Sequence, residues 1–566
     1  MWSYEAPLRD MEFVLEHWLQ APSAWQALDL SLAMQVLEEA ARFSQGVLAP
    51  LNSQGDRQGC RWQAGQVSTP DGFVEAYQAY VDGGWPGLAC AEAVGGQGLP
   101  QLLDAALQEM LYASNHAWAM YTGIAHGAYL CLKTHAEQWL QARYLPEIVS
   151  GQALPTMCLT EPQAGSDVGL LRCRAEPQAD GSYRLSGSKL FISGGEHDLT
   201  ANILHLVLAR LPDAPSGSRG ISLFLVPKRL DDGHVNGVRC DSLEHKMGIK
   251  GSATCSLTFE AAQAWLIGEA NRGLAAMFVM MNSARLHVGL QGLGHAEAAW
   301  QNARQYAAER VQMRAPIRPE EVAAQAADPI CYHPAMRRVL LELRTTSEGM
   351  RAIGYWAAHL LDRDDPLAPL LTPIIKAFFT EQGFRQASNA LQVFGGYGYV
   401  AEFAIEQTLR DSRIAMIYEG SNEIQANDLL LRKVLGDDGR VFGLLLGELR
   451  AEAGQGSEFV ECAAFSRALG SLCDTLHTVV SAIRERSLED SEYPYRAAPD
   501  FLQLCGVALL AFAWARAARV SRALPEGDPL RAAKLQSAGF FFDYLPSRLA
   551  QHLGAIDGAR AALAFV

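Results

Sequence analysis

The stretch Arg413-Ile-Ala-Met-Ile-Tyr-Glu-Gly-Ser421 decides how the rest of the sequence is interpreted. Its one acidic residue, Glu419, follows apolar residues that are expected to keep the carboxylate away from water. These apolar residues are Ile414, Met416 and Ile417. Burial would raise the pKa of Glu419 toward the range in which a glutamate removes protons efficiently. Gly420 allows a turn, and Ser421 can cap a following helix. Glu419 is therefore a candidate base, and the alternative is a solvated loop acid beside an ordinary helix start.

The size, charge and cysteine pattern of the chain exclude several classes of protein. A chain of 566 residues has room for three or four domains. A net charge of -15 argues against a nucleic-acid surface and against docking on anionic lipid. The 11 cysteines include no Cys-x-x-Cys pair, so neither a metal site nor a compact disulfide framework is predicted. Reduced thiols of a cytoplasmic protein fit this pattern.

Two segments bear on targeting and membrane insertion. Residues Met1–Asp10 lack the basic and apolar regions of a secretory signal and the arginine-rich character of a transit peptide. The apolar run Leu502–Ala515 contains Gly506, is followed closely by arginines, and is shorter than a membrane span. We therefore predict a buried helix there and no membrane span.

Hydrophobic periodicity divides the chain into helical and strand-rich parts and predicts an α+β fold. Residues 1–152 are expected to form an N-terminal helical domain and residues 153–268 a central β-barrel or β-sandwich. Residues 269–436 are expected to form a C-terminal helical bundle that carries Glu419, and residues 437–566 an additional helical domain. The clearest predicted strands are Tyr183–Ser193, Ile203–Ala209, Ile221–Val226 and Thr254–Phe259. The clearest predicted helices are Gly273–Gln312, Met336–Leu361 and Thr372–Phe394, with a surface insertion at Met313–Pro334.

Arg285, Gly289 and Gly292 share one face of the long predicted helix. Each glycine lowers helix propensity by about 1 kcal/mol relative to alanine, so a close approach of another group is expected there. Another helix or a ligand would satisfy this expectation, and close helix packing is the more common reason.

Three further motifs carry side chains suited to ligand binding. They are Thr160-Glu-Pro-Gln-Ala-Gly-Ser-Asp167, Lys189-Leu-Phe-Ile-Ser-Gly-Gly195 and Gln392-Val-Phe-Gly-Gly-Tyr-Gly-Tyr399. Their hydroxyl groups and glycine-freed backbone N–H groups can hold an anionic or planar ligand. Taken alone, each motif is also compatible with an ordinary turn or a core strand.

Taken in order, these motifs, Asn282-Ser-Ala-Arg-Leu286 and the Glu419 stretch resemble the flavin-dependent acyl-CoA dehydrogenases. The resemblance covers about Glu75 to Leu435. The N-terminal segment and the extra C-terminal helices are similar to those of a longer bacterial branch that includes the 3-methylmercaptopropionyl-CoA dehydrogenases. The resemblance implies FAD as cofactor and an acyl-CoA substrate. Glu419 would take the α-proton while the β-hydrogen leaves as hydride to flavin N5, which forms a trans-α,β double bond. The Glu419 backbone N–H and a flavin hydroxyl would stabilise the thioester oxygen.

The resemblance also implies a set of binding residues. The FAD-binding residues are Leu159, Thr160, Phe191, Ile192 and Ser193 near the isoalloxazine ring, Ser166 near the pyrophosphate, Arg310, Gln312, Gln392, Gly395 and Gly396 on the adenine side of a neighbouring subunit's FAD, and Ser421. The substrate-binding residues are Ser166, Asn282, Arg285 and Gly420. Gln312 is included because the family's usual aromatic–glycine pair after Arg310 is absent here. Arg285 has an alternative role in packing or in a salt bridge.

The helix around Asp104 to Tyr121 is expected to supply the floor of the substrate pocket. Met110, Met120 and Tyr121 are the candidates, although core packing is the more common role for such side chains.

Departures from the family pattern bear on the competing functions. Some relatives carry the base directly before the long-helix arginine, where this chain has Ala284, so Glu419 has no competitor there. The expected electron acceptor is an electron-transfer flavoprotein, in fatty-acid β-oxidation or a related step, and the expected assembly is a homodimer. One alternative is an acyl-CoA oxidase that uses O2. A second is a nitroalkane oxidase, but such an enzyme is expected to have aspartate at the position of Glu419. A third is a non-catalytic DNA-binding relative, but the acidic C-terminal region argues against DNA binding. Acyl-chain preference is left open.

Overall fold

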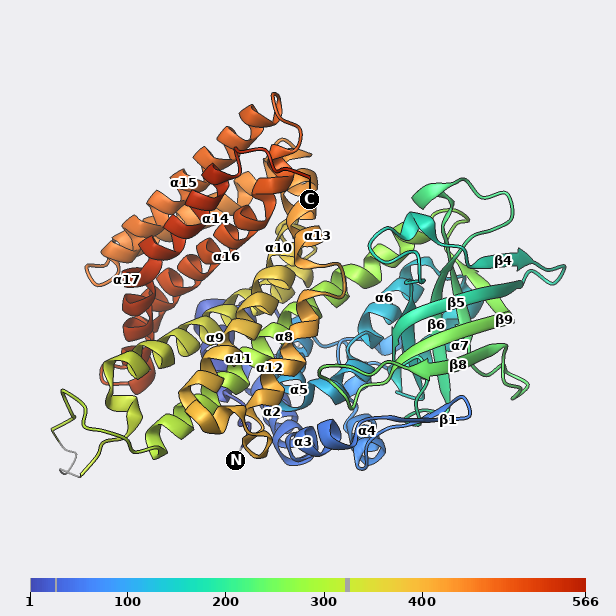
Figure 1. Ribbon diagram of the computed structural model, residues 1–566, viewed down its shortest axis with the longest axis horizontal. Coiled ribbons are helices and arrows are strands. Elements are labelled where there is room, and N and C mark those ends of the chain that lie inside the picture. Colours follow the sequence, from blue (N-terminus) through green and yellow to red (C-terminus); the bar gives the residue numbers. More distant parts are fainter. Residues whose placement is uncertain (1, 26–27, 321–325, 566) are drawn as a thin grey trace. The chain divides into compact units, whose positions relative to one another are not determined.

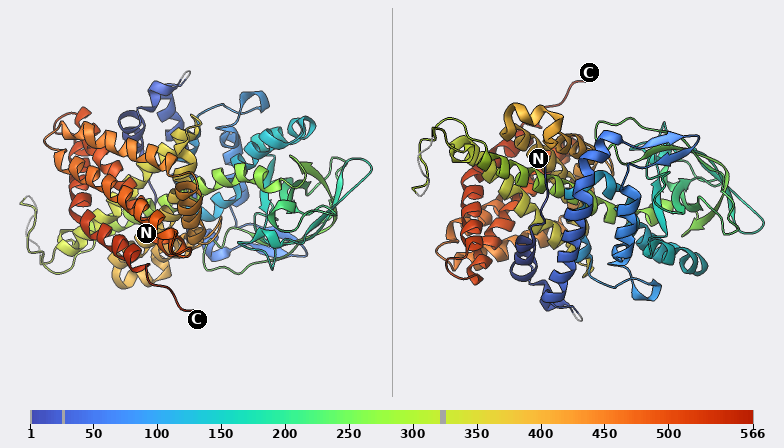
Figure 2. Two further views of the ribbon diagram at one scale, coloured as in Figure 1. Left: turned by 90° about the horizontal axis from the view of Figure 1, so that it is seen from above. Right: turned by 90° about the horizontal axis from the view of Figure 1, so that it is seen from below.

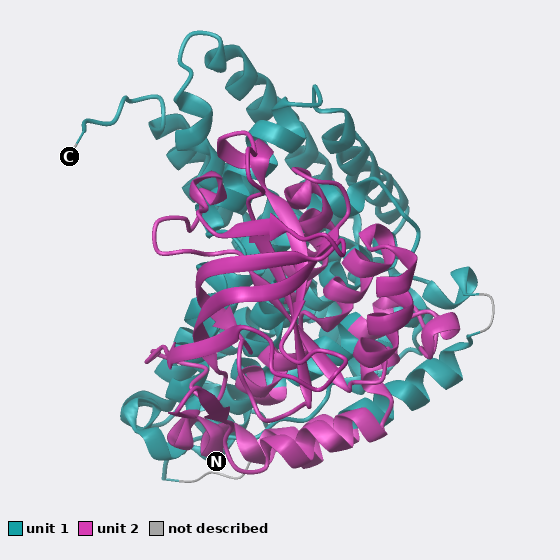
Figure 3. Ribbon diagram, turned by 90° about the vertical axis from the view of Figure 1, so that its right-hand side faces the viewer, with its two compact units in different colours: residues 1–41, 105–113, 288–566 teal, residues 42–104, 114–287 magenta. Residues whose placement is uncertain are grey.

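The computed structural model describes all residues except 1, 26–27, 321–325 and 566 (Figure 1). The chain forms two compact units, coloured separately in Figure 3. The sheet unit comprises Arg42–Asp104 and Ser114–His287, and the bundle unit comprises Met1–Ala41, Ala105–Ala113 and Val288–Val566. Each unit combines segments that are distant in sequence, so the linear boundaries predicted above remain predictions.

The sheet unit is built on one mixed seven-stranded sheet within the described chain. Its strands are β3 (Ala153–Cys158), β4 (Arg174–Pro177), β5 (Tyr183–Ser193), β6 (Asn202–Ala209), β7 (Ser222–Pro227), β8 (Val238–Leu243) and β9 (Thr254–Ile267). The order is β3-β6-β7-β9-β5-β4, with β8 also paired to β9. Among the paired strands that the structure describes in this sheet, only β3 and β6 run parallel. The strands predicted from alternation are confirmed as β5, β6, β7 and β9, whereas the short strands β4 and β8 were not predicted.

Two helices of the sheet unit pack on an apolar face of this sheet. They are α6 (Ala125–His135) and α7 (Gln138–Val149). The unit also contains α3 (Ala49–Gln58) and α4 (Phe73–Asp82). Tyr129 and Leu132 of α6 and Leu145 of α7 share one core cluster with Leu206 of β6 and Leu223 of β7. This packing holds β3 and the turn that follows it against a rigid support.

The N-terminal region is not all-helical as predicted. It contains a short hairpin of β1 (Arg61–Gln63) and β2 (Gln66–Ser68). Ala64 and Gly65 form its two-residue turn with φ values of 50° and 85°, as the twist of a tight hairpin requires. The strands are three residues long and largely exposed, so they leave almost no periodic hydrophobic signal.

The bundle unit consists of long packed helices (Figures 1 and 2). They include α1 (Leu8–Phe13), α2 (Leu30–Phe43, up to Ala41), the later part of α8 (Gly273–Glu309), α9 (Pro334–Leu361), α10 (Leu367–Ile374), α11 (Thr380–Phe394), α12 (Ile405–Ser412), α13 (Asn422–Asn427), α14 (Arg440–Ser457), α15 (Ala463–Ser487), α16 (Tyr493–Val520) and α17 (Pro529–Gly558). Helices α14 to α17 lie side by side in the views of Figures 1 and 2. The helices predicted at 273–312 and 336–361 are confirmed within a few residues. The one predicted at 372–394 is interrupted by a π-helical turn, Ile375–Phe379.

The apolar run at Leu502–Ala515 lies inside α16. The helical stretch Tyr493–Ala523 is long and apolar enough to cross a membrane, but 89% of its most apolar window is buried inside the protein. Trp514 and Phe512 on this helix are fully buried. The prediction of a buried helix is confirmed.

Helix packing explains Gly289 and Gly292 of the long helix α8. A Cβ atom on Gly289 would lie 2.4 Å from Cγ2 of Ile375, and one on Gly292 would lie 2.2 Å from the carbonyl oxygen of Phe379. Side chains at either position would therefore push the π-helical turn and the start of α11 away from α8. This close packing fixes the position of Ile375–Phe379, a segment that supports the candidate base.

Candidate active site

Glu419 lies in a short turn between a 3₁₀ turn, Arg413–Met416, and α13. Both Glu419 and Gly420 have left-handed backbone conformations, with φ values of 56° and 82°. Gly420 adopts this conformation without strain, as expected from the sequence. For a non-glycine residue such as Glu419 it costs about 1–3 kcal/mol and requires support from the surrounding structure.

Side chains of the bundle unit hold this turn in place. Nε2 of Gln425 donates a hydrogen bond to the Glu419 carbonyl oxygen at 2.9 Å. Nζ of Lys376 donates to the Gly420 carbonyl oxygen at 2.6 Å. The hydroxyl of Tyr418 donates to Oε1 of Gln291 on α8 at 2.5 Å. The backbone on both sides of the carboxylate is therefore fixed to neighbouring helices.

The environment of Glu419 differs in part from the sequence expectation. Ile417, which was expected to shield the carboxylate, is 53% exposed, whereas Ala415 is fully buried. The 3₁₀ turn explains the difference, because it rotates Ala415 rather than Ile417 toward the core. Glu419 itself is half-buried. Burial raises the pKa of the neighbouring Tyr418 well above its ordinary value, with smaller contributions from Tyr112 and Glu419.

Ser421 occupies the N-cap position of α13, as predicted, but its side chain accepts no capping hydrogen bond. Its hydroxyl interacts instead with the Glu423 carboxylate and so lowers the pKa of Glu423.

The residues expected near a flavin ring lie together at one edge of the sheet unit. Leu159 and Thr160 follow β3, and the backbone N–H of Leu190 on β5 donates to the Thr160 carbonyl oxygen at 2.9 Å. Phe191 is 60% exposed with φ 59°, whereas Ile192 is 2% exposed. A flavin could therefore contact Ile192 only through its backbone, while Phe191 offers its whole ring.

A β-bulge explains the orientation of Phe191. Lys189 pairs with Leu257 and Ile192 pairs with Cys255, so β5 has one residue more than β9 between these two pairs. A bulge of this kind re-aims a side chain away from the regular alternation. The ring of Phe191 and the half-buried Thr160 and Ser193 suit a flat, partly polar ring system, so these residues fit a flavin.

A buried ion pair supports this edge. Nζ of Lys189 donates to Oε1 of Glu161 and to the Leu159 carbonyl oxygen, each at 2.9 Å. Glu161 also accepts hydrogen bonds from the backbone N–H groups of Arg172 and Cys173, at 2.7 and 3.0 Å. Burial alone would raise the pKa of Glu161, but Lys189 and these backbone donors outweigh it and lower the pKa. The sequence offered one signal for this pair, a lysine at an inward-facing position of a strand, and the role of the pair was missed.

The residues expected on the adenine side lie in the bundle unit. The Arg310 guanidinium lies 5.6 Å from the centre of the Tyr397 ring, so Arg310 lies beside the Gly395–Tyr399 turn. Gln392, Gly395 and Gly396 are exposed there. Gln312 is anchored through its backbone, because its N–H donates to the Asp328 carbonyl oxygen at 3.0 Å. The predicted insertion at 313–334 includes residues 321–325, which lie outside the described residues.

The expected substrate residues differ in exposure. Ser166 and Asn282 are exposed in the sheet unit, and Arg285 is 7% exposed. Gly420 belongs to the Glu419 turn of the bundle unit. Of the pocket-floor candidates, Tyr121 accepts a hydrogen bond from Ala253 N at 2.8 Å and donates to Gly251 O at 3.1 Å, so it has a structural role.

These two groups of residues define a class of protein. One unit presents a carboxylate on a fixed turn, and the other presents an exposed aromatic ring with hydroxyl groups at a sheet edge. Such features belong to a flavin-dependent oxidoreductase.

Comparison with known proteins identifies the family. The acyl-CoA dehydrogenase N-terminal, middle and C-terminal domains match residues 33–152, 156–262 and 271–433, and an acetyl-CoA dehydrogenase C-terminal-like domain matches residues 445–565. The chain therefore belongs to the acyl-CoA dehydrogenase family. It is an FAD-dependent oxidoreductase that dehydrogenates acyl-CoA thioesters.

Two relatives and one structure illustrate the similarity. The chain is 42% identical over 459 residues to 3-methylmercaptopropionyl-CoA dehydrogenase of Ruegeria pomeroyi, covering 77% of each protein. It is 34% identical over 501 residues to the broad-specificity linear acyl-CoA dehydrogenase FadE5 of Mycobacterium tuberculosis, covering 82% of each. An acyl-CoA dehydrogenase from Bacillus anthracis, solved with FAD, has the same fold, with a TM-score of 0.75, 20% identity and coverage of 96% of this chain and 93% of that one.

Proposed function

We propose that Glu419 is the base that removes the α-proton of the acyl-CoA thioester. The observation that carries this proposal is the backbone of Glu419, held at φ 56° by hydrogen bonds on both sides of the residue. A strained turn with this support limits the positions that the carboxylate can reach. Proton transfer requires the base to lie within hydrogen-bonding distance of the proton, so holding the carboxylate in one position increases the rate of this step.

The same turn supplies a second function. The backbone N–H of Glu419 is a donor for the thioester oxygen, so it would stabilise the negative charge that develops there when the α-proton leaves. Because the turn is fixed by Tyr418 and Gln425, this donor needs little reorganisation during the reaction. FAD, when bound, supplies the acceptor for the hydride that leaves the β-carbon.

Binding of FAD is assigned to both groups of residues. Thr160, Phe191 and Ser193 are proposed to contact the ring system, supported by the exposed Phe191 ring. Leu159 and Ile192 would contribute backbone contacts. Ser166, Asn282, Arg285 and Gly420 are proposed to bind the substrate. The remaining proposed FAD-binding residues are Arg310, Gln312, Gln392, Gly395, Gly396 and Ser421.

An exposed apolar surface supports assembly as a homodimer. Tyr399 is 87% exposed and Tyr397 46%, both within the Gly395–Tyr399 turn, and Val400, which follows it, is 41% exposed. Exposed apolar patches of this kind mark interaction sites, and a second copy of the chain is the expected partner.

All 11 cysteines are thiols, which supports a cytoplasmic location. The proposed electron acceptor is an electron-transfer flavoprotein, in β-oxidation or a related catabolic step.

Replacement of Glu419 tests the assignment of the base. Glu419→Gln keeps the shape of the side chain but removes its basicity, so the variant should retain FAD and lose bleaching of the flavin absorbance by substrate. Glu402→Gln, an exposed acid of the same unit, is the matched control and should react as the unmodified protein does. Retained turnover in Glu419→Gln would refute the assignment.

Acyl-chain preference and electron acceptor require separate assays. A panel of acyl-CoAs of graded length, including a methylthio analogue, would give the substrate class. Anaerobic reduction followed by admission of air distinguishes the acceptor, because an oxidase reoxidises rapidly in O2 and a dehydrogenase needs an electron-transfer flavoprotein.

A further inference from the structure

Lys376 is a buried lysine whose ammonium binds the residue that follows the proposed base. Its side chain is fully buried, and its ammonium donates to the Gly420 carbonyl oxygen at 2.6 Å and to Oδ1 of Asn422 at 3.2 Å. A buried lysine is costly unless it is well hydrogen-bonded. This buried ammonium contacts Gly420, the residue directly after Glu419, so its position calls for an explanation.

The backbone around Lys376 is shaped to bring it there. Lys376 lies in the π-helical turn Ile375–Phe379, a feature that is frequent at functional sites. The hydroxyl of Thr380 donates to the Lys376 carbonyl oxygen at 2.8 Å, which satisfies a carbonyl near the irregular turn. The close packing of Gly289 and Gly292 against this segment leaves it little freedom to move.

Asn422 connects this turn to the beginning of α13. Its Nδ2 donates to the Ala377 carbonyl oxygen at 3.2 Å, and its Oδ1 accepts from Lys376 and, at 3.4 Å, from Thr380. The segment that follows Glu419 is thereby attached to the π-helical turn through both its backbone and its first helical residue.

We propose that Lys376 is a positioning residue for the dehydrogenation, which rests on the proposed role of Glu419. Its ammonium holds the carbonyl oxygen of Gly420, the residue after the base, and so fixes the left-handed turn. As a cation it also brings a positive charge to this turn. A neutral donor would be sufficient to hold a carbonyl group. The charge adds a second effect, because a nearby cation favours the ionised, basic form of a carboxyl group.

Other charged and titratable groups lie around the same turn and enter the expected pH dependence. On α13 the neighbour is Glu423, whose carboxylate is stabilised by Lys376 and Arg413 in addition to Ser421. On α11 it is Glu381, whose pKa is raised by burial and by Glu423. Tyr112, on helix α5 (Gln101–Thr122), interacts electrostatically with Tyr418, and burial raises the pKa of Tyr418 well above its ordinary value. Lys376 is a buried cation that contacts the turn directly.

Three substitutions separate the charge from the hydrogen bond. Lys376→Met removes both, Lys376→Gln keeps a donor without the charge, and Lys376→Arg keeps the charge. The assay is the rate of substrate-induced flavin bleaching in the full-length holoenzyme across pH. We expect Lys376→Met to slow this step by roughly tenfold or more with little change in KM, since misplacement of a catalytic group has effects of this size. In the Met and Gln variants the acidic limb of the pH profile should move to higher pH by about one unit, and in the Arg variant it should stay in place.

A second measurement keeps the test independent of the base and of folding problems. Hydrogen–deuterium exchange of the peptide spanning 413–427 should be faster in Lys376→Met, which has no donor for the Gly420 carbonyl oxygen, than in Lys376→Gln and the unmodified holoenzyme. Lys133→Met, which removes an exposed lysine of α6, is the control and should change neither readout. If Lys376→Met does not fold, the Gln variant decides the question. The proposal for Lys376 is wrong if a folded Met or Gln variant leaves the bleaching rate, the pH profile and the exchange rate unaltered. By contrast, turnover retained by Glu419→Gln would overturn the assignment of the base.

Discussion

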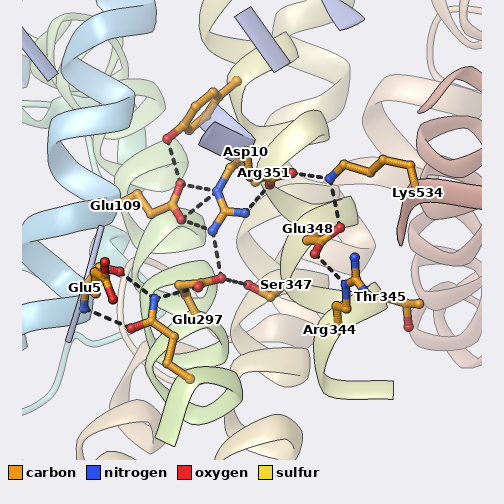
Figure 4. Close-up of polar contacts among 12 residues, drawn as sticks. Glu5, Asp10, Glu109, Glu297, Arg344, Thr345, Ser347, Glu348, Arg351 and Lys534 are labelled. Carbon is orange, nitrogen blue, oxygen red and sulfur yellow. Dashed lines mark hydrogen bonds and ion pairs between the residues drawn. The ribbon is translucent and has the colours of Figure 1, made fainter. Parts of the chain in front are cut away.

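Lys534 on the last long helix, α17, forms a buried ion pair with Asp10 on the first helix, α1 (Figure 4). Nζ of Lys534 also lies 2.8 Å from Oε2 of Glu348 on α9. Asp10 in turn accepts from Nη1 of Arg351 at 2.5 Å. Arg351 contacts two further carboxylates, Glu109 at 2.6 Å and Glu297 at 2.7 Å. This network joins both ends of the chain to the centre of the bundle unit.

The first prediction concerns the stability of this network. Lys534→Met leaves the carboxylates of Asp10 and Glu348 buried without this cation, so it should lower the free energy of unfolding by about 3–5 kcal/mol. Chemical denaturation measures this change. Arg9→Ala is the control, because the Arg9–Asp528 pair also involves α1 but the Arg9 side chain is 59% exposed, and such pairs contribute roughly 0–1 kcal/mol. Equal losses in the two variants would contradict a special role for the buried pair.

The second prediction concerns pH. Burial alone would raise the pKa of Asp10, but Lys534 and Arg351 outweigh it and lower the pKa. A carboxyl group with a lowered pKa in the folded state stabilises the fold above its unfolded pKa, which is about 4 for aspartate. This stabilisation is lost as the pH falls through the folded pKa. The difference in unfolding free energy between the unmodified protein and Asp10→Asn should therefore be largest at neutral pH and shrink below about pH 4. A constant difference from pH 7 to pH 3 would show that ionisation of Asp10 is not responsible.

The third prediction concerns the buried pair at the sheet edge. Lys189→Met leaves Glu161 without its cation and frees the Leu159 carbonyl oxygen, so it should destabilise the sheet unit by about 3–5 kcal/mol. Because the same pair holds the Thr160 turn, the purified variant should also carry less flavin, as measured by the ratio of flavin to protein absorbance. Arg184→Met changes an exposed residue of the same strand and should keep both properties. If Lys189→Met is destabilised but keeps its full flavin content, the Lys189–Glu161 pair is not needed for flavin binding.

The fourth prediction concerns the turn that carries the base. A Cβ atom on Gly420 would lie 2.8 Å from Nε2 of Gln425, the atom that donates to the Glu419 carbonyl oxygen. With φ at 82°, Gly420→Ala should cost about 1–3 kcal/mol of stability and slow flavin bleaching, while FAD is retained. The control is Gly443→Ala in α14, which has open space at this position and should stabilise the protein by about 0.5–1 kcal/mol. A neutral effect of Gly420→Ala would show that the turn can relax.

The sequence alone determined the fold class, the family and the identity of the candidate base. Periodicity sufficed for β5, α8 and α9 because these elements are long, with 11, 37 and 28 residues. It failed for β1 and β2, which are short and exposed, and for the π-helical turn at Ile375, which has no period of its own.

Tertiary structure decided what holds the site residues in place. The left-handed backbone of Glu419 depends on donors from Gln425 and Lys376, and Lys376 lies 43 positions before Glu419 in the chain. Likewise, the exposure of Phe191 depends on a one-residue offset between β5 and β9. Local patterns report which side chains face a core. Contacts between segments distant in sequence depend on how those segments pack, and packing is fixed only when the whole chain folds.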